Sequence, residues 1–165
     1  MGIDPGYARL GFGIIKFFQD SSKMDILDYG VLETSSREKH ENRLLAIQKG
    51  IQRLIKKFRP DTVAIEKIFL AKNRKTGIQV AEARGVILAT AALLKLEIAE
   101  YSPLEVKIAI TGNGHCDKGD MQEMVKILCS LDEIPKPDDA ADGLANALTF
   151  IHQFSFRKAV KKYMN

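Results

Sequence analysis

The order of extended and helical patterns along the 165 residues constrains the fold more than any other feature of the sequence. Segments 11–19 and 24–33 are rich in strand-forming residues, and the polar Ser-Ser-Lys between them predicts a hairpin. Extended and helical patterns then alternate, which is typical of strands joined by helical crossovers. The sequence therefore predicts an α/β domain with a mixed sheet, a meander first and crossover units after it.

The later elements follow from periodicity and from residues that begin or end helices. Apolar residues from Leu44 to Phe58 have helical spacing, and Pro60 ends this helix. Ser35 and Glu38 have the spacing of a capping box in front of it. Further strands are expected at 61–66 and 96–101, and further helices at about 76–95, 103–110, 118–130 and 138–153.

Composition places the chain among globular proteins. It is 45% hydrophobic and 28% charged, and it lacks both a run of 18 apolar residues and a signal-peptide pattern, so neither a membrane helix nor secretion is expected. Cys116 and Cys129 are expected to be reduced thiols of a cytosolic protein. No linker or repeat interrupts the chain, so we expect one domain over 1–165 with a basic tail from about residue 155.

The charge balance allows a polyanionic partner without establishing one. The net charge is +4 and the isoelectric point is near 9.0. Aromatic residues make up only 7% of the chain and Trp is absent, which argues against a stacking platform for long single strands. A solvated surface is the alternative explanation for the basic residues, which gather at Lys67, Lys72, Arg74 and Lys75 and at Arg157, Lys158, Lys161 and Lys162.

Two carboxylates are expected at one edge of the sheet. Asp4 follows a short apolar lead and stands before Pro-Gly, and Glu66 ends the apolar strand Val-Ala-Ile-Glu. Parallel strands joined by right-handed crossovers end at the same edge, where α/β sheets bind ligands. Asp4 and Glu66 are therefore expected to be neighbours. The alternative for Asp4 is a turn residue that bonds its own backbone.

The last predicted helix supplies two more acids. Asp139 and Asp142 are three residues apart, which places both carboxylates on one helix face among Ala and Leu residues. A buried charge is costly unless it is paired or binds a metal. Capping and the helix dipole are the alternative explanation. Asp138 suits the cap, whereas Asp142, further inside the helix, is less well explained in this way.

Four carboxylates without a neighbouring His or Cys describe an oxygen cage for Mg²⁺ or Mn²⁺ rather than zinc. The expected chemistry is two-metal phosphodiester hydrolysis, and the acids should raise each other's pKa when no metal is bound. The consecutive His115, Cys116 and Asp117 do not predict a zinc site, because residues in one turn cannot all face one ion. Asp117 is expected to cap the helix at 118–130.

Five stretches, in order and over nearly the whole chain, resemble RuvC-type Holliday junction resolvases. They are GIDPG at 2–6, AIEKIFLAKN at 64–73, ARGV at 83–86, VKIAITGNGHCDKGDMQ at 106–122 and DDAADGLANAL at 138–148. The resemblance implies a ribonuclease H-like three-layer domain with a five-stranded mixed sheet flanked by helices. It implies a cytoplasmic bacterial homodimer that resolves four-way DNA junctions in recombination and repair by paired symmetric nicks, with partners of the RuvA and RuvB type.

The resemblance also carries roles to individual residues. The catalytic and metal-binding acids would be Asp4, Glu66, Asp139 and Asp142, holding two Mg²⁺, for which Mn²⁺ can substitute. Phe69 matches an aromatic residue that contacts opened bases, although a lone Phe is more often a core residue. Lys107 and Lys118 match lysines near the DNA phosphates, and Lys72 lies in the basic cluster beside Phe69, although surface lysines are ordinary.

The chain departs from the family pattern at two places, of which only the first, the short strand before Asp4, is expected to affect activity. Only three residues precede Asp4, so the first strand should be short and could hold Asp4 loosely. Gly143 stands where the family usually has Ala, which could loosen the last helix at a cost of roughly 1 kcal/mol. A junction-binding protein that no longer cuts is therefore the alternative hypothesis.

Two further points remain open in the sequence. A phosphotransferase of the actin and sugar-kinase type also begins with an apolar-Asp-x-Gly loop, but the chain is too short for the two domains it needs.

Apolar residues of the helix at 76–95 are a candidate dimer interface, and the alternative is that they belong to the core. They are Ile78, Val80, Ile87 and Leu88.

Overall fold

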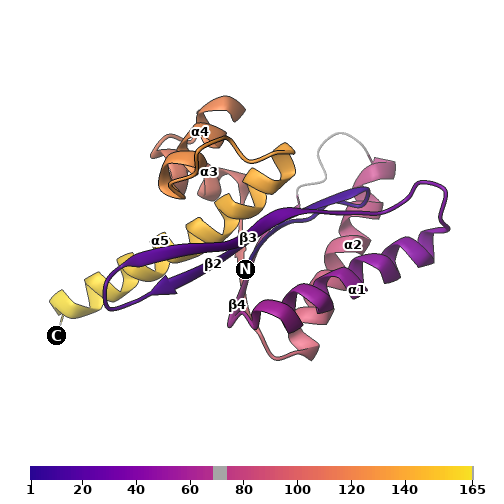
Figure 1. Ribbon diagram of the computed structural model, residues 1–165, viewed down its shortest axis with the longest axis horizontal. Coiled ribbons are helices and arrows are strands. Elements are labelled where there is room, and N and C mark those ends of the chain that lie inside the picture. Colours follow the sequence, from indigo (N-terminus) through magenta and orange to yellow (C-terminus); the bar gives the residue numbers. More distant parts are fainter. Residues whose placement is uncertain (69–73, 165) are drawn as a thin grey trace.

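The computed structural model describes residues 1–68 and 74–164, and Figure 1 shows the described chain in colour. Five strands form one sheet in the order β3-β2-β1-β4-β5. The strands are β1 (Gly2–Asp4), β2 (Arg9–Phe18), β3 (Lys23–Glu33), β4 (Thr62–Glu66) and β5 (Glu97–Tyr101). β1 to β3 pair antiparallel, whereas β4 pairs parallel with both β1 and β5. The predicted mixed sheet, with a meander first, is confirmed.

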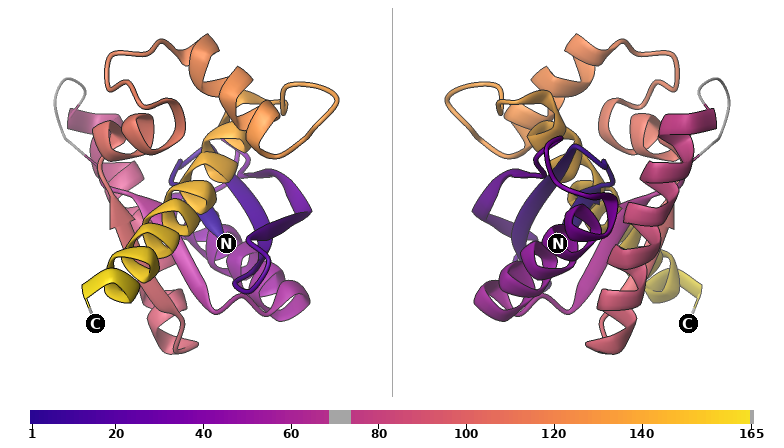
Figure 2. Two further views of the ribbon diagram at one scale, coloured as in Figure 1. Left: turned by 90° about the vertical axis from the view of Figure 1, so that its left-hand side faces the viewer. Right: turned by 90° about the vertical axis from the view of Figure 1, so that its right-hand side faces the viewer.

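Helices cover both faces of this sheet and complete three layers. They are α1 (His40–Phe58), α2 (Arg74–Leu93), α3 (Pro103–Thr111), α4 (Lys118–Leu128) and α5 (Asp138–Met164). α1 and α2 lie on one face, and α5 crosses the other face with α3 and α4 against it (Figures 1 and 2). In the described part of the chain, no helix is both long and apolar enough to cross a bilayer.

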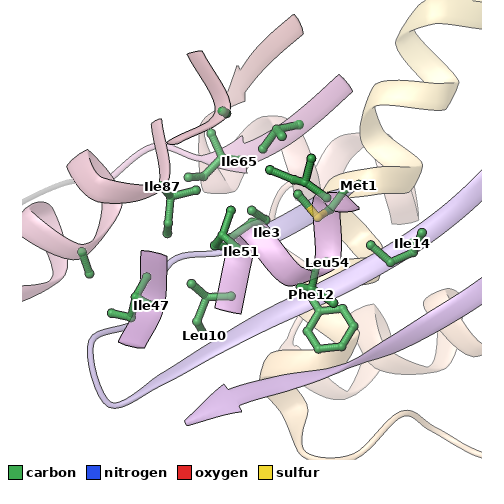
Figure 3. Packing of buried hydrophobic residues seen from close by; sticks show 14 of the residues in the cluster. Met1, Ile3, Leu10, Phe12, Ile14, Ile47, Ile51, Leu54, Ile65 and Ile87 are labelled. Carbon is green, nitrogen blue, oxygen red and sulfur yellow. The ribbon is translucent and has the colours of Figure 1, made fainter. Parts of the chain in front are cut away.

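Large aliphatic side chains fill the layer between the sheet and α1 and α2 (Figure 3). Ile47 and Ile51 of α1 and Ile87 of α2 are almost fully buried against Ile3 and Ile65 of the central strands. Of the candidate interface residues on α2, Ile87 therefore belongs to the core, and Val80 and Leu88 pack against it. Ile78 alone of these four is largely exposed, at 56%.

Several helix boundaries differ from the predictions. α5 continues to Met164 instead of ending near residue 153, so the basic segment after residue 155 is helical. The capping box at Ser35 and Glu38 is wrong, because these residues form a turn in which the Glu38 N–H donates to the Ser35 carbonyl at 3.2 Å. α1 begins later, at His40, with Lys39 as an N-cap that makes no side-chain hydrogen bond.

Other helix signals are confirmed. α1 ends before Pro60, with Arg59 in the left-handed conformation as its C-cap. Asp117 caps α4, and its carboxylate accepts a hydrogen bond from the Asp120 N–H at 2.8 Å. Ser102 and Glu105 form a capping box at the start of α3, and Pro103 is the first residue of the helix. These residues begin α3 directly after β5.

β1 is as short as expected, but it is held on both sides. Ile3 faces Phe12 of β2 and Ile65 of β4, and it is completely buried. Just before the strand, the Met1 nitrogen donates to the Thr62 carbonyl at 2.9 Å, and the Met1 carbonyl accepts from the Ala64 N–H at 2.8 Å. The central position of β1 thus compensates for its length, because a strand with two partners gains ladder bonds on both edges.

Candidate active site

The structure brings the four predicted acids together at one edge of the sheet. Asp4 ends β1 and Glu66 ends β4, and these strands are parallel neighbours in register at Ile3 and Ile65. Asp139 and Asp142 lie in the first turns of α5, which reaches the same edge from one face. The charges of Glu66, Asp139 and Asp142 lie near enough to raise the pKa of Asp4, which agrees with a common location at this edge.

Close backbone contact between α5 and β2 holds the helical acids at this edge. Gly11 of β2 lies so near α5 that a methyl group on it would stand 1.7 Å from the Asp139 carbonyl oxygen. Gly143 of α5 lies against the Phe12 backbone, which a methyl group on it would approach to 2.6 Å. The replacement of the family's Ala by Gly143 had suggested a looser helix. In the structure, the missing side chain at Gly143 instead permits the close approach of α5 to β2.

Asn146 fastens α5 to the strand that carries Asp4. Its side-chain amide is fully buried and donates to the Ile3 carbonyl and to the Asp142 carbonyl, both at 3.1 Å. Its Oδ1 is buried without a hydrogen-bond partner. One side chain thus ties the backbone before Asp4 to the backbone of Asp142, which limits how far these acids can move apart.

Arg84 of α2 fixes the other strand end. Its Nε donates to the Glu66 carbonyl at 3.0 Å, and its guanidinium also pairs with the Glu100 carboxylate of β5. The Arg84 side chain is only 17% exposed, which shields its bond to the Glu66 carbonyl, whereas the Glu100 side chain is 41% exposed. Arg84 therefore orients the end of β4, while the Glu66 carboxylate remains available to a ligand.

The acids repel one another and are partly withdrawn from water. Burial raises the pKa of Asp4 to about 7, and the charges of Asp142, Glu66 and Asp139 add to this effect. Burial, with the charge of Asp142, also raises the pKa of Glu66 to about 7. The pKa of Asp142 is raised by burial too, although the Lys118 ammonium opposes the shift. A cation in the site would relieve this repulsion.

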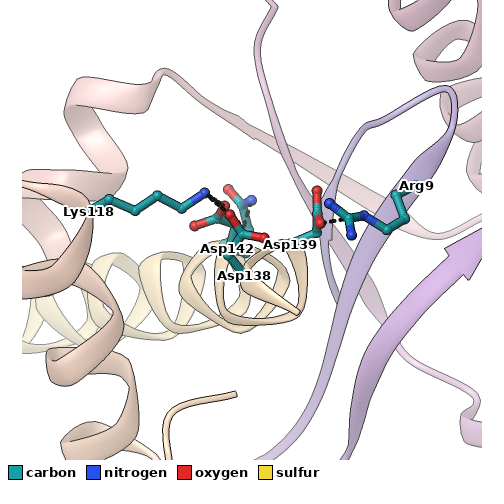
Figure 4. Close-up of polar contacts among 6 residues, drawn as sticks. Arg9, Lys118, Asp138, Asp139 and Asp142 are labelled. Atoms are coloured by element: carbon teal, nitrogen blue, oxygen red, sulfur yellow. Dashed lines mark hydrogen bonds and ion pairs between the residues drawn. The ribbon is translucent and has the colours of Figure 1, made fainter. Parts of the chain in front are cut away.

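Two basic side chains flank the acids from opposite sides (Figure 4). Lys118 of α4 bonds the Asp138 carboxylate and lies 3.8 Å from Oδ2 of Asp142. The hydrogen bond from Lys118 lowers the pKa of Asp138 and raises the pKa of Lys118. Arg9 of β2 places its Nε 2.8 Å from Oδ2 of Asp139.

The Arg9 contact is an ion pair and not a hydrogen bond. Oδ2 of Asp139 is buried and receives no hydrogen bond, despite the short distance to the guanidinium. The N–H vector is therefore not directed at this oxygen, because a hydrogen bond weakens steeply as its angle closes. This oxygen therefore keeps its capacity to accept a hydrogen bond or to bind a cation.

The residues fit a hard divalent cation by their chemistry. All four acids supply oxygen ligands, which Mg²⁺ and Mn²⁺ prefer, and the raised pKa values of Asp4 and Glu66 reflect first their burial and then the neighbouring negative charge. In the described ranges, no three acidic, His or Cys side chains converge closely enough to hold an ion as they stand. Arg9 and Lys118 engage the carboxylates instead, so binding a metal requires these side chains to give way.

The predicted DNA-binding residues differ in their placement. Lys118 lies beside the acids with 58% of its side chain exposed. Lys107 of α3 donates to the Cys116 carbonyl at 2.6 Å and so closes the loop between α3 and α4. Phe69 and Lys72 lie outside the described residues. The absence of a zinc site at 115–117 is consistent with Cys116 being buried and Asp117 capping α4.

Sequence reasoning missed Arg9, Arg84, Asn146 and Gly11 as site-supporting residues. An asparagine one helical turn after Asp142, on a face of Ala and Leu, was a usable signal, because a buried amide requires partners. Arg84 lay inside a quoted motif but had no visible partner. Arg9 and Gly11 carried no signal, because their importance depends on where α5 crosses β2.

The fold and the site together define a class of protein: a ribonuclease H-like α/β domain with a nuclease-type cluster of carboxylates at the edge of its sheet. The family model for crossover junction endodeoxyribonuclease RuvC matches residues 1–150. The chain therefore belongs to the RuvC family of crossover junction endodeoxyribonucleases, which are metal-dependent nucleases.

Individual relatives agree over almost the full length. RuvC from Caldicellulosiruptor saccharolyticus is 50% identical over 151 residues, which cover 92% of this chain and 90% of the relative. RuvC from Alkaliphilus metalliredigens is 44% identical over 98% of this chain and 97% of its own. A solved structure of T. thermophilus RuvC in complex with Holliday junction substrate matches with a TM-score of 0.84 and 30% identity, covering 94% of both chains.

Proposed function

We propose that this protein resolves Holliday junctions in DNA recombination and repair by paired symmetric nicks in two strands of like polarity. The observation that carries the proposal is the cluster of four coupled carboxylates, in which Asp4 and Glu66 have a pKa of about 7. A similar protein, T. thermophilus RuvC, has been solved with a Holliday junction substrate, which supports the choice of DNA.

Two Mg²⁺ ions are the cofactor that suits this site best. Asp4, Glu66, Asp139 and Asp142 would hold them, and Mn²⁺ can substitute because it has the same preference for oxygen ligands. Bound metal would supply an activated water as the nucleophile and would stabilise the leaving oxygen. The contribution of the chain is to hold the backbone that carries the acids in place, through Asn146 and Arg84, so that metal binding requires only the side chains to rearrange.

DNA contacts would come from basic residues around the acids. Lys118 is exposed beside the site, and its ammonium can turn from Asp138 to a phosphate. Lys107 would act through the loop whose carbonyl it binds. Phe69 and Lys72 remain the predicted contacts to opened bases and to the backbone, since an aromatic wedge can separate base steps.

Assembly and location follow from the proposed substrate. A four-way junction has near two-fold symmetry, so a homodimer would present two like sites to it. The exposed Ile78 of α2 is the remaining candidate interface residue from the sequence. Partners of the RuvA and RuvB type would supply branch migration, and the site of action would be the bacterial cytoplasm, where the chromosome lies.

Cleavage of a synthetic mobile four-way junction tests the proposal. We expect symmetric nicks on the junction, none on linear duplex of the same sequence, and none with EDTA. Asp142→Asn should abolish cleavage while junction binding remains. Tight binding without nicks under any metal would favour the alternative of a non-cutting junction binder, and absence of junction preference would reject both. The hydrogen bonds on both sides of β1 support cutting.

A further inference from the structure

Arg9 is a cation at the acid site for which the resemblance supplied no role. It is the first residue of β2, at the edge of the sheet where Asp4 lies. Its Nε is 2.8 Å from Oδ2 of Asp139, and 45% of its side chain is exposed (Figure 4). It therefore touches both a predicted metal ligand and the solvent through which DNA would approach.

The hold of Asp139 on Arg9 is weak. The buried oxygen receives no hydrogen bond from the guanidinium, so only charge attraction joins the two groups. Toward the residues that the structure describes, the Arg9 side chain makes no hydrogen bond and no second ion pair. The firmer contact is that of Lys118, which hydrogen-bonds Asp138 as well as lying near Asp142.

A divalent cation would displace Arg9 from Asp139. A metal bound to the carboxylates carries twice the charge of the guanidinium and lies closer to the oxygen than 2.8 Å, at about 2.1 Å for Mg²⁺. The guanidinium would then face a cation instead of an anion, and this repulsion favours outward rotation. Its planar fork of donors matches a phosphate group, so DNA offers it a replacement partner.

Space for this rotation is present. Ala8, Arg9, Glu33, Thr34 and Asp139 line an open hollow of about 510 Å³ beside the acids. Glu33 faces Arg9 across the β2–β3 pairing and is exposed, so it is the competing partner for a released guanidinium. A phosphate would also be attracted by cations held at Asp139, whereas Glu33 would not gain this attraction in its exposed position on β3.

We propose that Arg9 is an exchangeable counter-ion: it neutralises Asp139 in the metal-free protein and binds a DNA phosphate once metal occupies the acids. This inference rests on the proposed function and adds to it a coupling between metal binding and DNA binding. Arg9 would be a positioning residue for the DNA strand, and its contribution to DNA affinity would exist only when metal is present.

Metal binding without DNA tests the first half. Calorimetric titration with Mn²⁺ would compare the wild-type protein with Arg9→Gln, Arg9→Lys and Arg53→Gln, the last being an exposed arginine on α1. We expect Arg9→Gln to bind Mn²⁺ about twofold to fivefold more tightly, because a competing ion pair of modest strength is removed. Arg9→Lys and Arg53→Gln should match the wild type. An unchanged affinity in a folded Arg9→Gln protein would overturn the exchange.

Junction binding tests the second half. Fluorescence anisotropy over a range of KCl concentrations would be measured with Ca²⁺, with gels to verify that the DNA stays uncut, and again with EDTA. With Ca²⁺, Arg9→Gln should lower the salt slope by about 1, the loss of one phosphate contact, whereas Arg9→Lys should retain it. With EDTA, Arg9→Gln should match the wild type, because Arg9 is then engaged by Asp139.

The two proposals fail in different ways. An equal loss of slope with Ca²⁺ and with EDTA would mean that Arg9 is a fixed DNA contact, and no loss in either would mean that it turns to Glu33; both results overturn the exchange. Wild-type protein that shows no preference for the junction would reject the proposed function itself, whatever the variants do. Circular dichroism of each variant ensures that a folding defect is not taken for either outcome.

Discussion

The two faces of the sheet are packed in opposite ways. Between the sheet and α1 and α2, large side chains such as Ile47, Ile51 and Ile87 fill the space, so the layers are held apart by bulk. Between the sheet and α5, glycines let backbone meet backbone, at Gly2, Gly11 and Gly13 on the strands and at Gly143 on the helix. The first face supplies burial of apolar surface, whereas the second fixes the distance between Asp4 and the acids of α5.

This difference has a physical reason. Hydrophobic burial is non-directional and tolerates rearrangement of side chains of similar volume. A cluster of carboxylates that shares cations requires positions fixed to a fraction of an ångström, which flexible side chains do not provide but backbone contact does. Perturbations of equal size should therefore have unequal consequences on the two faces.

Gly11→Ala should break the α5 face most severely. The added methyl group would meet the Asp139 carbonyl at 1.7 Å, so either β2 or α5 must move. We expect a loss of about 3 kcal/mol in the free energy of unfolding, measured by urea denaturation, and loss of junction cleavage. The matched control is Gly85→Ala in α2, where nothing lies within 4 Å, and which should gain about 0.5–1 kcal/mol. Equal effects at the two glycines would contradict the comparison.

A change in pH acts on the acid site below about pH 6, and above that also on the Met1 amino group, whose pKa burial lowers to about 6. Because the pKa of Asp4 and of Glu66 is about 7 in the folded protein, against ordinary values of 3.8 and 4.5, the metal-free folded state binds more protons than the unfolded state between about pH 4 and 7. Its stability should therefore fall as pH rises through this window. Thermal melts at pH 5 and pH 6 without metal check the sign, because the buried Met1 amino group titrates above this range and has the opposite effect.

The same protonation opposes metal binding. Raising the pH from 6 to 8 should tighten Mn²⁺ binding by about tenfold for each of the two groups that must ionise, with release of protons. Calorimetry in buffers of different ionisation enthalpy measures both quantities. Asp4→Asn should remove one of the two groups and weaken the pH dependence. An affinity that does not change over this range would contradict the crowded-carboxylate site.

Asn146→Ala should loosen α5 without crowding it. The variant loses both amide hydrogen bonds to the carbonyls of Ile3 and Asp142, and we expect a cost of about 2 kcal/mol together with weaker metal binding. The control is Thr149→Ala one turn later, where the buried hydroxyl bonds only the Ala145 carbonyl of its own helix. That variant should lose stability to a smaller extent and keep its metal affinity.

Ile51→Val should have the smallest effect and act only on stability. Ile51 lies on the face of α1 that packs against the sheet and is fully buried. Removal of one methylene group should lower the free energy of unfolding by about 0.5–1.5 kcal/mol. Because this face does not set the distances between the acids, metal affinity and cleavage at moderate temperature should be unchanged. A loss of metal affinity comparable to that of Asn146→Ala would show that the two faces are not independent.

Much of the fold was readable in the sequence because its cues are local. The hairpin, the strands ending in Asp4 and Glu66, and the cap at Asp117 depend on neighbours within a few residues, and the structure has all of them. The convergence of Asp4 and Glu66 also followed, because crossover handedness leaves few alternatives. The failed capping box at Ser35 shows the limit: the motif was present, but the chain closed a turn there and began α1 later.

The sequence by itself determined which elements form, which residues are carboxylates, and that parallel strands deliver two of these acids to one edge. The tertiary structure alone decided how near α5 approaches β2, a contact that leaves little room for a side chain at Gly11 or Gly143. It also decided which cation faces which acid, Arg9 at Asp139 and Lys118 at Asp138. The reason is that periodicity and capping act between near neighbours in sequence, whereas the clearance between two backbones and the pairing of distant charges depend on the packing of the whole chain.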